Sequence, residues 1–397
     1  MMKALLLLLF ASAGLVICAT PPVFVHPGVF LNSSDLSILK ARLASGAEPQ
    51  TSALVEANAS PLSSLGYKVH GPPINGKVTC GPYDKPNIGC NNETADADAA
   101  LLHAMLFILS GDVAHASLSR SIVNLYTSGL TGYEDSNAPL QAGWCGAKWV
   151  RVAELLRYTA NSGWTEADTV AFTAMIVEIH LPLIYNGSGS NGNWELTMLD
   201  AMLGFSVFLE DAQLFNHTVT FWRQRTPASF YSFIIDGNQH APFPPGRDNN
   251  STSWYNQTVF NASTNGVCQE TCRDFGHMQM GLGSCLAAAA TARINGVDLF
   301  AEEAPRLTGA MEFAAGWLLK GESPTNPLPQ QSPLLCSAAP MTLYYIATYE
   351  VGYRELAVRL QNELPLVAQL LKDIVRPLLN PDSLCSEWET LTHGEPL

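Results

Sequence analysis

The sequence predicts an all-α fold, an α/α toroid (an incomplete α/α barrel) with long loops around one mouth. Apolar residues recur with the helical period in successive segments that end at glycine or asparagine. No segment has the alternation of a convincing strand, and no short internal repeat stands out. Because successive helix pairs are joined by short turns, a ring of paired helices fits this pattern best.

The first helices of the ring are expected from Ala95 onward. The segment ADAALLHAMLFILSGD ends in Ser-Gly-Asp, a stop followed by a new start, and HASLSRSIVNLYTSG again ends at glycine. The next segment, CGAKWVRVAELLRYTANSG, has the spacing of an amphipathic helix. Its apolar face consists of Trp149, Val152, Ala153 and Leu156.

The later helices also have recognisable starts. Thr165 and Asp168 form a capping box ahead of an apolar run, and Asn193 immediately precedes WELTMLDAMLGFSVFLED. Further helices are predicted from Met280 to Ile294, from Ala301 to Lys320 and from Glu355 to Leu379. Long loops are expected at 69–92, 186–193 and 236–266, and loops of such length are usually functional.

Residues 1–19 have the layout of a secretory signal peptide. A lysine precedes an apolar run from Ala4 to Phe10, and small residues end at Ala19. The apolar run is shorter than the ~20 residues that a membrane-spanning helix needs. We therefore expect a secreted, extracellular protein without a membrane anchor, in which residues 20–397 form a single α/α-toroid domain with its core at about 95–380.

Cysteines and glycosylation acceptors fit this compartment. Of nine cysteines, Cys18 lies in the expected signal peptide, which leaves eight (9 − 1) in an oxidising environment, so disulfides are expected. The one pairing we predict is Cys80–Cys90, a local loop staple. Acceptors for N-glycosylation occur at Asn32, Asn58, Asn92, Asn186, Asn216, Asn249, Asn250, Asn256 and Asn261, a density that favours a secreted glycoprotein.

The charge balance limits the possible partners. A formal net charge of −14 without any cluster of lysine and arginine argues against binding to nucleic acid. If the substrate is a polyanion, the positive charge that binds it must be concentrated in a cleft. We expect a monomer that binds neither nucleic acid nor membranes.

The segment CQETCRDFGHMQMGLG, residues 268–283, is unusually rich in reactive side chains for this chain. If it starts a helix, Arg273 and His277 lie four residues apart on one face, and Arg273 can offer a planar fork to a carboxylate. The alternative is a structural ion pair between Glu270 and His277 on a polar rim. Zinc binding by the two cysteines and His277 is disfavoured, because a second close ligand pair is missing, so we expect no metal.

Two further segments supply candidate site residues. In GSGSNGNWELTML, Asn193 is either an N-cap or an amide that donates to a substrate carboxylate across a cleft, beside Trp194. The loop 236–260 is either a solvated surface loop or a sugar-binding wall that contributes His240, Arg247, Trp254 and Tyr255. His103 and His180 lie in apolar helical runs and are expected to be buried core residues.

These segments together resemble the alginate-lyase superfamily of α/α-toroid polysaccharide lyases, including relatives that act on glucuronan. The resemblance rests on NGNWELTMLDAMLGFSVFLED followed by WYNQTVF, NGVCQETCRDFGHMQMGLG and AAATARINGVDLF, and covers about 98–320. It implies an asparagine and an arginine that neutralise a uronate carboxylate, and a histidine and a tyrosine that exchange protons. Asn193, Arg273 and His277 match by position in their motifs.

The chain departs from the family pattern at two positions. Met280 stands where the pattern has a tyrosine, and Tyr255 is our candidate substitute because of its place in the loop. Trp194 stands where some members have a histidine. The resemblance implies β-elimination on an alginate- or glucuronan-type polyuronate without a cofactor, with Asn193, Tyr255, Arg273 and His277 catalytic. The expected substrate-binding residues are Trp194, His240, Trp254 and Glu270.

Two alternatives remain open at this point. A glycoside hydrolase on a similar α/α barrel needs two carboxylic acids facing each other across a cleft, and the available acids are Glu195, Asp200, Glu270 and Asp274. A non-catalytic glycan-binding glycoprotein would instead use Trp194, Trp254 and Tyr255 as a platform for sugar rings.

Overall fold

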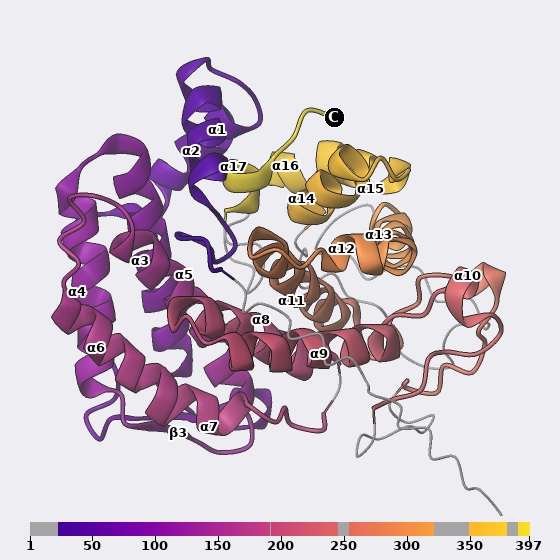
Figure 1. The fold of residues 1–397 in the computed structure, drawn as a ribbon, viewed down its shortest axis with the longest axis horizontal. Coiled ribbons are helices and arrows are strands. Elements are labelled where there is room, and N and C mark those ends of the chain that lie inside the picture. Colours follow the sequence, from indigo (N-terminus) through magenta and orange to yellow (C-terminus); the bar gives the residue numbers. More distant parts are fainter. Residues whose placement is uncertain (1–22, 191, 245–253, 321–348, 379–387) are drawn as a thin grey trace, which may run out of the picture.

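The computed structural model describes residues 23–190, 192–244, 254–320, 349–378 and 388–397 (Figure 1). The expected signal peptide, Arg247, Asn249 and Asn250 lie outside these residues, and what we predict for them stays a prediction.

Helices that are buried along most of their length form the inside of the molecule. They are α3 (Cys90–Ser110), α5 (Ala138–Arg157), α8 (Gly192–Phe208) and α11 (Phe275–Ile294), and α8 packs against both α5 and α11 (Figure 1). A helix without a polar face is stable only when neighbours cover it all round. Close approach needs small residues: a Cβ on Gly204 of α8 would lie 2.4 Å from Cγ1 of Val150 on α5.

The inner helices run parallel to one another, because contacts between neighbours advance together along both chains. Thr94 of α3 lies 3.8 Å from Cys145 of α5, and Asp98 pairs with Lys148, one turn further along each helix. On α8 and α11, Asn193 faces Gly281 and Thr197 bonds Ser284 at 2.8 Å. The amino ends of the inner helices therefore meet at one mouth of the ring, and their carboxyl ends meet at the other.

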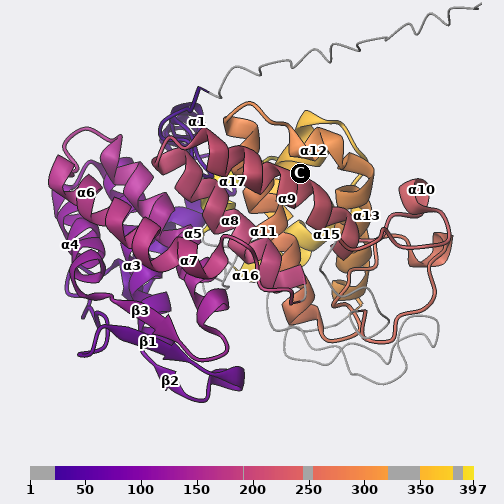
Figure 2. The same ribbon diagram turned by 60° about the horizontal axis from the view of Figure 1, so that its bottom comes forward.

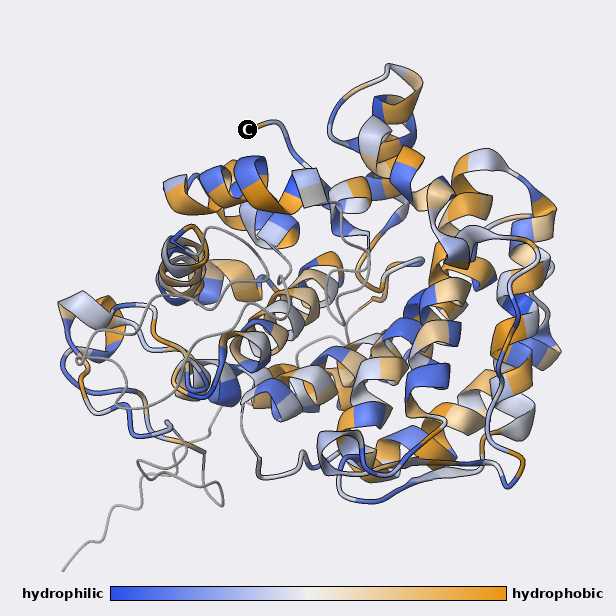
Figure 3. Cartoon of the chain, turned by 180° about the vertical axis from the view of Figure 1, so that it is seen from behind, coloured by the Kyte–Doolittle hydropathy of each residue, from blue (hydrophilic) through white to orange (hydrophobic). Residues whose placement is uncertain are grey.

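Outer helices alternate with the inner ones along the chain. They are α4 (Val113–Gly129), α6 (Glu166–Met175) with its continuation through 176–180 into α7 (Leu181–Ile184), α9 (Ala212–Ser229), α12 (Leu299–Glu302) and α13 (Ala304–Leu318). Blue and orange residues mix along the rim helices in Figure 3, as expected for helices with one buried face. This alternation of inner and outer helices confirms the predicted α/α toroid.

One outer stretch, Glu166–Ile184, is long and apolar enough by length and composition to cross a membrane, with a mean hydropathy of 1.5. Core helices have the same properties, and this stretch packs against α4 and α5 of the ring.

The helices near the two ends of the described chain pack together. α1 (Ser33–Ala44) and α2 (Gln50–Ala59) contact α17 (Glu389–His393), beside α14 (Tyr349–Gly352) with its continuation 353–359, α15 (Pro365–Leu370) with 371–375, and α16 (Arg376–Leu378) (Figure 1). The short helix α10 (Phe233–Asp236) lies in the long loop after α9.

A small sheet was not predicted from the sequence. β1 (Lys77–Cys80) pairs antiparallel with β2 (Asn87–Ile88) and parallel with β3 (Gly132–Glu134), at one end of the molecule (Figure 2). No strand was recognised in the sequence, because strands of two to four residues are too short to show alternation. The predicted disulfide Cys80–Cys90 is confirmed and ties β1 to the start of α3.

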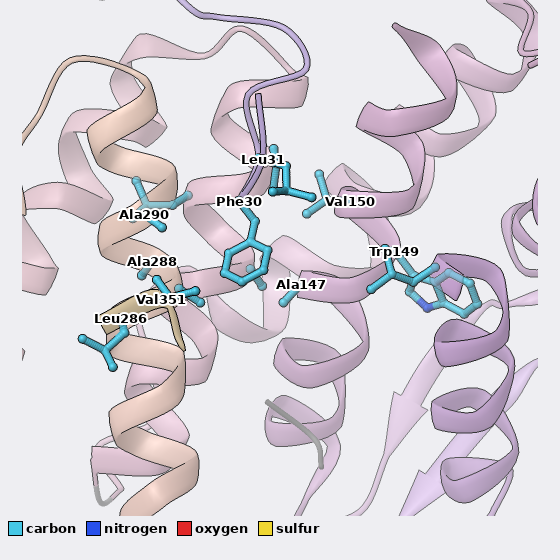
Figure 4. Close-up of a cluster of buried hydrophobic side chains, with 14 of the residues drawn as sticks. Phe30, Leu31, Ala147, Trp149, Val150, Leu286, Ala288, Ala290 and Val351 are labelled. Carbon is cyan, nitrogen blue, oxygen red and sulfur yellow. The ribbon is translucent and has the colours of Figure 1, made fainter. Parts of the chain in front are cut away.

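A segment near the amino end fills the mouth formed by the carboxyl ends of the inner helices. Gly28 N–H donates to Glu154 Oε2 at 3.0 Å, near the end of α5, and Phe30 N–H donates to Thr291 Oγ1 at 3.1 Å, near the end of α11. The Phe30 ring is 4% exposed and lies between α5 and α11 (Figure 4). Segment 23–31 therefore acts as a plug of the ring.

Several predicted details of the core are confirmed. The four residues of the predicted apolar face on α5, including Trp149 and Leu156, are fully buried, and Thr165 and Asp168 form the capping box of α6. His103 and His180 are buried, and burial lowers the pKa of each to about 4.

Other expectations were wrong in their boundaries or pairings. α3 begins at Cys90 rather than Ala95, and Glu303 separates α12 from α13 within the single helix expected there. The expected helix from Glu355 is interrupted where Gln361 adopts a left-handed backbone with φ 58°. Among the described cysteines, Cys145, Cys268 and Cys285 are free and buried, so the expected disulfides do not include them.

Candidate active site

The candidate site lies at the mouth formed by the amino ends of the inner helices. Two segments far apart in sequence, the start of α8 and the turn before α11, are tied together there. Gln269 N–H donates to Ser229 O at 2.7 Å, and Gly192 N–H donates to Gln269 Oε1 at 2.9 Å. The turn that carries Glu270 and Arg273 is thus fixed against α8.

Asn193, Glu270 and Arg273 form one hydrogen-bonded group. Asn193 donates to the Glu270 carboxylate through its backbone N–H at 2.9 Å and through Nδ2 at 2.7 and 2.6 Å. Arg273 Nη1 donates to Glu270 Oε1 at 2.9 Å from the other side. Asn193 and Glu270 are buried, whereas Arg273 is 26% exposed, so Arg273 is the member that faces outward.

This geometry decides between the two roles considered for Asn193. The helix α8 already begins at Gly192, so Asn193 lies in its first turn and does not cap it. Its amide hydrogens point to Glu270, and its Oδ1 is buried without a hydrogen-bond partner among the described residues. The Glu270 carboxylate therefore accepts from an amide, a backbone N–H and a guanidinium, which fixes the position of Arg273.

Asp274 and His277 form a second pair at the start of α11. Asp274 is the N-cap of α11: its Oδ1 accepts from His277 N–H at 2.8 Å, and its Oδ2 lies 2.6 Å from His277 Nδ1. The expected placement of Arg273 and His277 on one helix face was wrong, because α11 starts at Phe275. The expected alternative pair of Glu270 with His277 was also wrong, since Arg273 pairs with Glu270 and Asp274 with His277.

The Asp274 pair sets the chemistry that His277 can perform. Burial raises the pKa of Asp274, but the hydrogen bond and charge of His277, together with Arg273, outweigh it and hold that pKa below its ordinary value. An ionised Asp274 fixes the Nδ1 proton of His277 and leaves Nε2 as an acceptor. His277 is 32% exposed, and within the described part of the chain nothing bonds Nε2.

Tyr255 lies beside Arg273. The Arg273 Cζ atom is 5.9 Å from the centre of the Tyr255 ring, and Tyr255 is half-buried in a left-handed backbone conformation with φ 51°. Burial lowers the pKa of Arg273, but Glu270, Tyr255 and Asp274 outweigh it and raise that pKa above its ordinary value. The expected catalytic residues thus come from three segments and are linked by the described contacts.

The expected sugar-binding aromatic residues are placed less favourably. Trp254 is 1% exposed, because Phe260 and His240 pack against its ring at 5.1 and 4.9 Å, so it is a core residue and no open platform. Within the described residues, no contact joins His240 to Arg273 or His277; its Nδ1 lies 2.9 Å from Ala241 O. Trp194 is half-buried next to Asn193, and Met280 is 3% exposed.

Most of the carboxylic acids near this mouth are already committed to protein partners. Glu195 is buried and accepts from the backbone N–H groups of Ser188 and Gly189, and Asp200 is buried against Arg151 at 2.7 Å. Glu270 is buried as described above. Asp274, which is paired with His277, is therefore the one partly exposed acid among the four hydrolase candidates.

Two features of the site that were not predicted have signals in the sequence. An aspartate directly before an apolar run is a typical N-cap, which identifies Asp274 as the residue that starts α11. Gly281 lies where α11 meets α8, since a Cβ there would be 3.3 Å from Asn193 Cα.

In the part of the chain that the structure describes, no group of three or more His, Cys, Asp or Glu side chains could hold a metal ion.

No family model matches the sequence, and no curated protein matches it either. Solved structures do match. Alginate lyase A1-III from Sphingomonas species A1 aligns with a TM-score of 0.54 at 13% identity, covering 75% of this chain and 80% of that chain. An alginate lyase from Bacteroides ovatus aligns with a TM-score of 0.54 at 12% identity, covering 94% of this chain and 100% of that chain. This chain shares the fold of these alginate lyases.

A variant of A1-III complexed with tetrasaccharide aligns similarly, with a TM-score of 0.53 at 13% identity, covering 75% of this chain and 79% of that chain. The alginate lyase fold predicted from the sequence motifs is thereby confirmed. At such identities the similarity establishes the fold alone, and activity has to be argued from the residues of this chain.

Proposed function

We propose that this protein is a secreted polysaccharide lyase that cleaves a polyuronate of the alginate or glucuronan type by β-elimination. The observation that carries the proposal is the arrangement at the ring mouth. A partly exposed Arg273 is anchored by the buried Glu270 and Asn193, and it lies between Tyr255 and the Asp274–His277 pair. A positive group flanked by two proton-exchanging groups is what elimination beside a carboxylate requires.

Arg273 is proposed to bind the substrate carboxylate. The C5 proton of a uronate is barely acidic while the carboxylate keeps its charge, so the charge that develops during proton removal must be stabilised. Arg273 Nη1 is held by Glu270, and among the residues described no acceptor binds Nη2. Nη2 can therefore donate to the substrate. Asn193 acts through Glu270, because its backbone N–H and Nδ2 hold the carboxylate that anchors Arg273.

His277 is proposed as the base and Tyr255 as the acid. His277 Nε2 takes the C5 proton, the electrons form the C4–C5 double bond, the bond between C4 and O4 breaks, and the Tyr255 hydroxyl protonates O4. His277 is assigned as the base because Asp274 stabilises the imidazolium that forms when His277 takes a proton. Tyr255 is assigned as the acid because its ring lies beside Arg273 and its hydroxyl can donate a proton.

The hydrolase alternative is less well supported by the geometry. Glycoside hydrolysis needs two carboxyl groups that face the substrate, about 5 to 9.5 Å apart. Glu195, Asp200 and Glu270 are buried and paired, which leaves Asp274 without an exposed acid partner among those candidates. The glycan-binding alternative loses Trp254 from its platform, because that ring is buried.

Secretion and glycosylation belong to the same proposal. Among the expected acceptors, Asn58, Asn92, Asn186, Asn216 and Asn256 are exposed, as glycosylation requires. Mass spectrometry of the secreted protein, before and after removal of N-glycans, tests both the cleavage near Ala19 and the occupied acceptors.

The activity is tested by incubating the purified protein with alginate and with glucuronan while recording ultraviolet absorbance and new reducing ends. Elimination produces a conjugated C4–C5 double bond that absorbs, and EDTA should not lower the rate. The matched variants are Arg273→Ala, which should be inactive, and Arg223→Ala, which removes an exposed arginine paired with Glu302 and should keep full activity.

Two outcomes would overturn the proposal. Reducing ends without ultraviolet absorbance would show hydrolysis, and polymer binding without any cleavage would show a catalytically silent glycan-binding protein. Full activity of Arg273→Ala would refute the role of the arginine even if the reaction is an elimination.

A further inference from the structure

A cavity lies at the amino end of α3, away from the residues assigned to catalysis. It has a volume of ≈ 560 Å³ and opens between α2, the first turns of α3 and Trp388. Its polar and aromatic lining consists of Glu56, Ser60, Asn91, Thr94, Asp98 and Trp388. This size falls within the range of about 300 to 1,000 Å³ that is typical of ligand pockets.

The cavity opens at the same mouth of the ring as the candidate active site. Gln141 at the start of α5 donates to Cys90 O at the start of α3, at 3.1 Å. On the other side of α5, Gly143 faces Thr197, one turn beyond Asn193 in α8. Neighbouring helix axes lie about 8 to 10 Å apart, so α3 is roughly 20 Å or less from α8. A polysaccharide segment of a few sugar units is long enough to span this distance.

The chemistry of the cavity differs from that of the active site. Among its described lining residues there is no lysine, arginine or histidine, and two are carboxylic acids, the exposed Glu56 and the partly exposed Asp98. Lys148 pairs with Asp98 from behind and is only 1% exposed, so its charge is not presented to a ligand. A uronate would meet carboxylates here without a cation to bind it.

A neutral sugar fits this lining. Carboxylates accept hydrogen bonds from hydroxyl groups, and amide and hydroxyl side chains such as those of Asn91 and Ser60 both donate and accept. The half-buried Trp388 offers an aromatic face to the C–H side of a sugar ring. Trp388 is held in a left-handed backbone conformation, with φ 64°, at the start of α17, which packs on α2.

We propose that this cavity binds a neutral sugar unit. Together with the proposed function, on which this part rests, the cavity assigns the substrate to mixed polysaccharides in which neutral sugars accompany the uronate that is cleaved. A pure polyuronate would then be bound through the Arg273 site alone and would have a higher KM than a mixed polymer.

The direct test measures binding rather than cleavage. Isothermal titration and saturation-transfer NMR are carried out with a neutral trisaccharide such as cellotriose or mannotriose, and with a trimer of uronate at the same ionic strength. Trp388→Ala should weaken binding of a neutral trisaccharide by about tenfold or more, because the aromatic contact is lost. Tyr83→Ala is the matched control, since Tyr83 is 89% exposed and lies outside the cavity.

A second variant changes an exposed residue, so its effect on binding is not confounded by a loss of stability. Glu56 is exposed, so Glu56→Lys should leave the fold intact while it places a cation at the cavity. We expect Glu56→Lys to weaken binding of the neutral trisaccharide and to strengthen binding of the uronate trimer. Circular dichroism of each variant checks that the helices are retained.

The proposal is refuted if neither neutral trisaccharide binds, if both variants bind it as the wild type does, or if the uronate trimer binds in a Trp388-dependent way at equal strength. Failure of the lyase function is recognised separately. Arg273→Ala should leave binding of the neutral trisaccharide unchanged, so the cavity stands or falls independently of cleavage.

Discussion

Asp274 offers the sharpest test of the proposed chemistry, because its two carboxylate oxygens do different work. Oδ1 caps α11 by accepting from His277 N–H at 2.8 Å, and Oδ2 lies 2.6 Å from His277 Nδ1. In Asp274→Asn the amide oxygen can keep the cap, but the NH2 group then faces Nδ1. Nδ1 must become the acceptor, so the proton moves to Nε2 and His277 can no longer act as a base.

Two substitutions at this position, Asp274→Asn and Asp274→Ala, should therefore separate stability from activity. The first should mainly lower activity, and the second should also lower stability. The free energy of unfolding of Asp274→Asn should lie within about 0.5 kcal/mol of the wild-type value, since asparagine and aspartate cap equally well. The turnover of this variant should nevertheless fall by ~100-fold or more. Asp274→Ala loses the cap at about 1 kcal/mol. Asp274→Ala also loses the charged hydrogen bond to His277, which contributes about 1.5 to 3 kcal/mol. Because this hydrogen bond stabilises the imidazolium that forms in the reaction, its loss should lower turnover by roughly 10- to 150-fold.

The measurements are initial rates of ultraviolet absorbance and urea unfolding for the same preparations. An Asp274→Asn protein with near-normal turnover would refute the tautomer argument, and one as unstable as Asp274→Ala would refute the capping argument. The pKa of Asp274 is lowered in the fold, so its ionised form stabilises the protein above about pH 3.9, and this contribution is lost as the pH falls below it. The stability difference between wild type and Asp274→Ala should accordingly shrink as the pH falls below about 3.9.

The remaining predictions concern the proposed acid and the plug of the ring. Tyr255→Phe should keep polymer binding, because the ring remains, and lose turnover by ~100-fold or more; near-normal turnover would remove Tyr255 from the mechanism. Phe30→Ala should lower the free energy of unfolding by about 3 to 5 kcal/mol, because the ring is 4% exposed and Arg151 lies 4.2 Å above it. A change below 1 kcal/mol in urea unfolding would show that segment 23–31 does not hold the ring together.

The helical framework was predictable because its signals are local. The apolar face of α5 and the capping box of α6 depend on residues three or four positions apart, and both are present in the structure. The small sheet escaped because β2 has two residues and β3 has three, and their pairing depends on positions distant in sequence. Burial of Trp254 escaped for the same reason, since it depends on how the loop folds back upon Phe260.

The candidate site was predictable as a set of residues but not as an arrangement. Arg273 and His277 could be selected from one short segment, but their partners within it were assigned wrongly, because the N-cap at Asp274 ends the turn and starts α11. The hydrogen bonds from Asn193 to Glu270 join residues 77 positions apart. No periodicity or propensity in a single sequence encodes such a contact, so the direction of the Asn193 amide could come only from the fold.

The plug formed by segment 23–31 sets an order of events during synthesis. Phe30 donates to Thr291, which is translated 261 residues later. At a synthesis rate of about 5 to 20 residues per second, the interval between them is roughly 13 to 52 seconds. During that time the apolar side chains of this segment have no place in the ring, and they are available to chaperones or to other nascent chains. Conditions that slow translation should therefore lower the yield of folded protein, even though they do not change the stability of the finished ring.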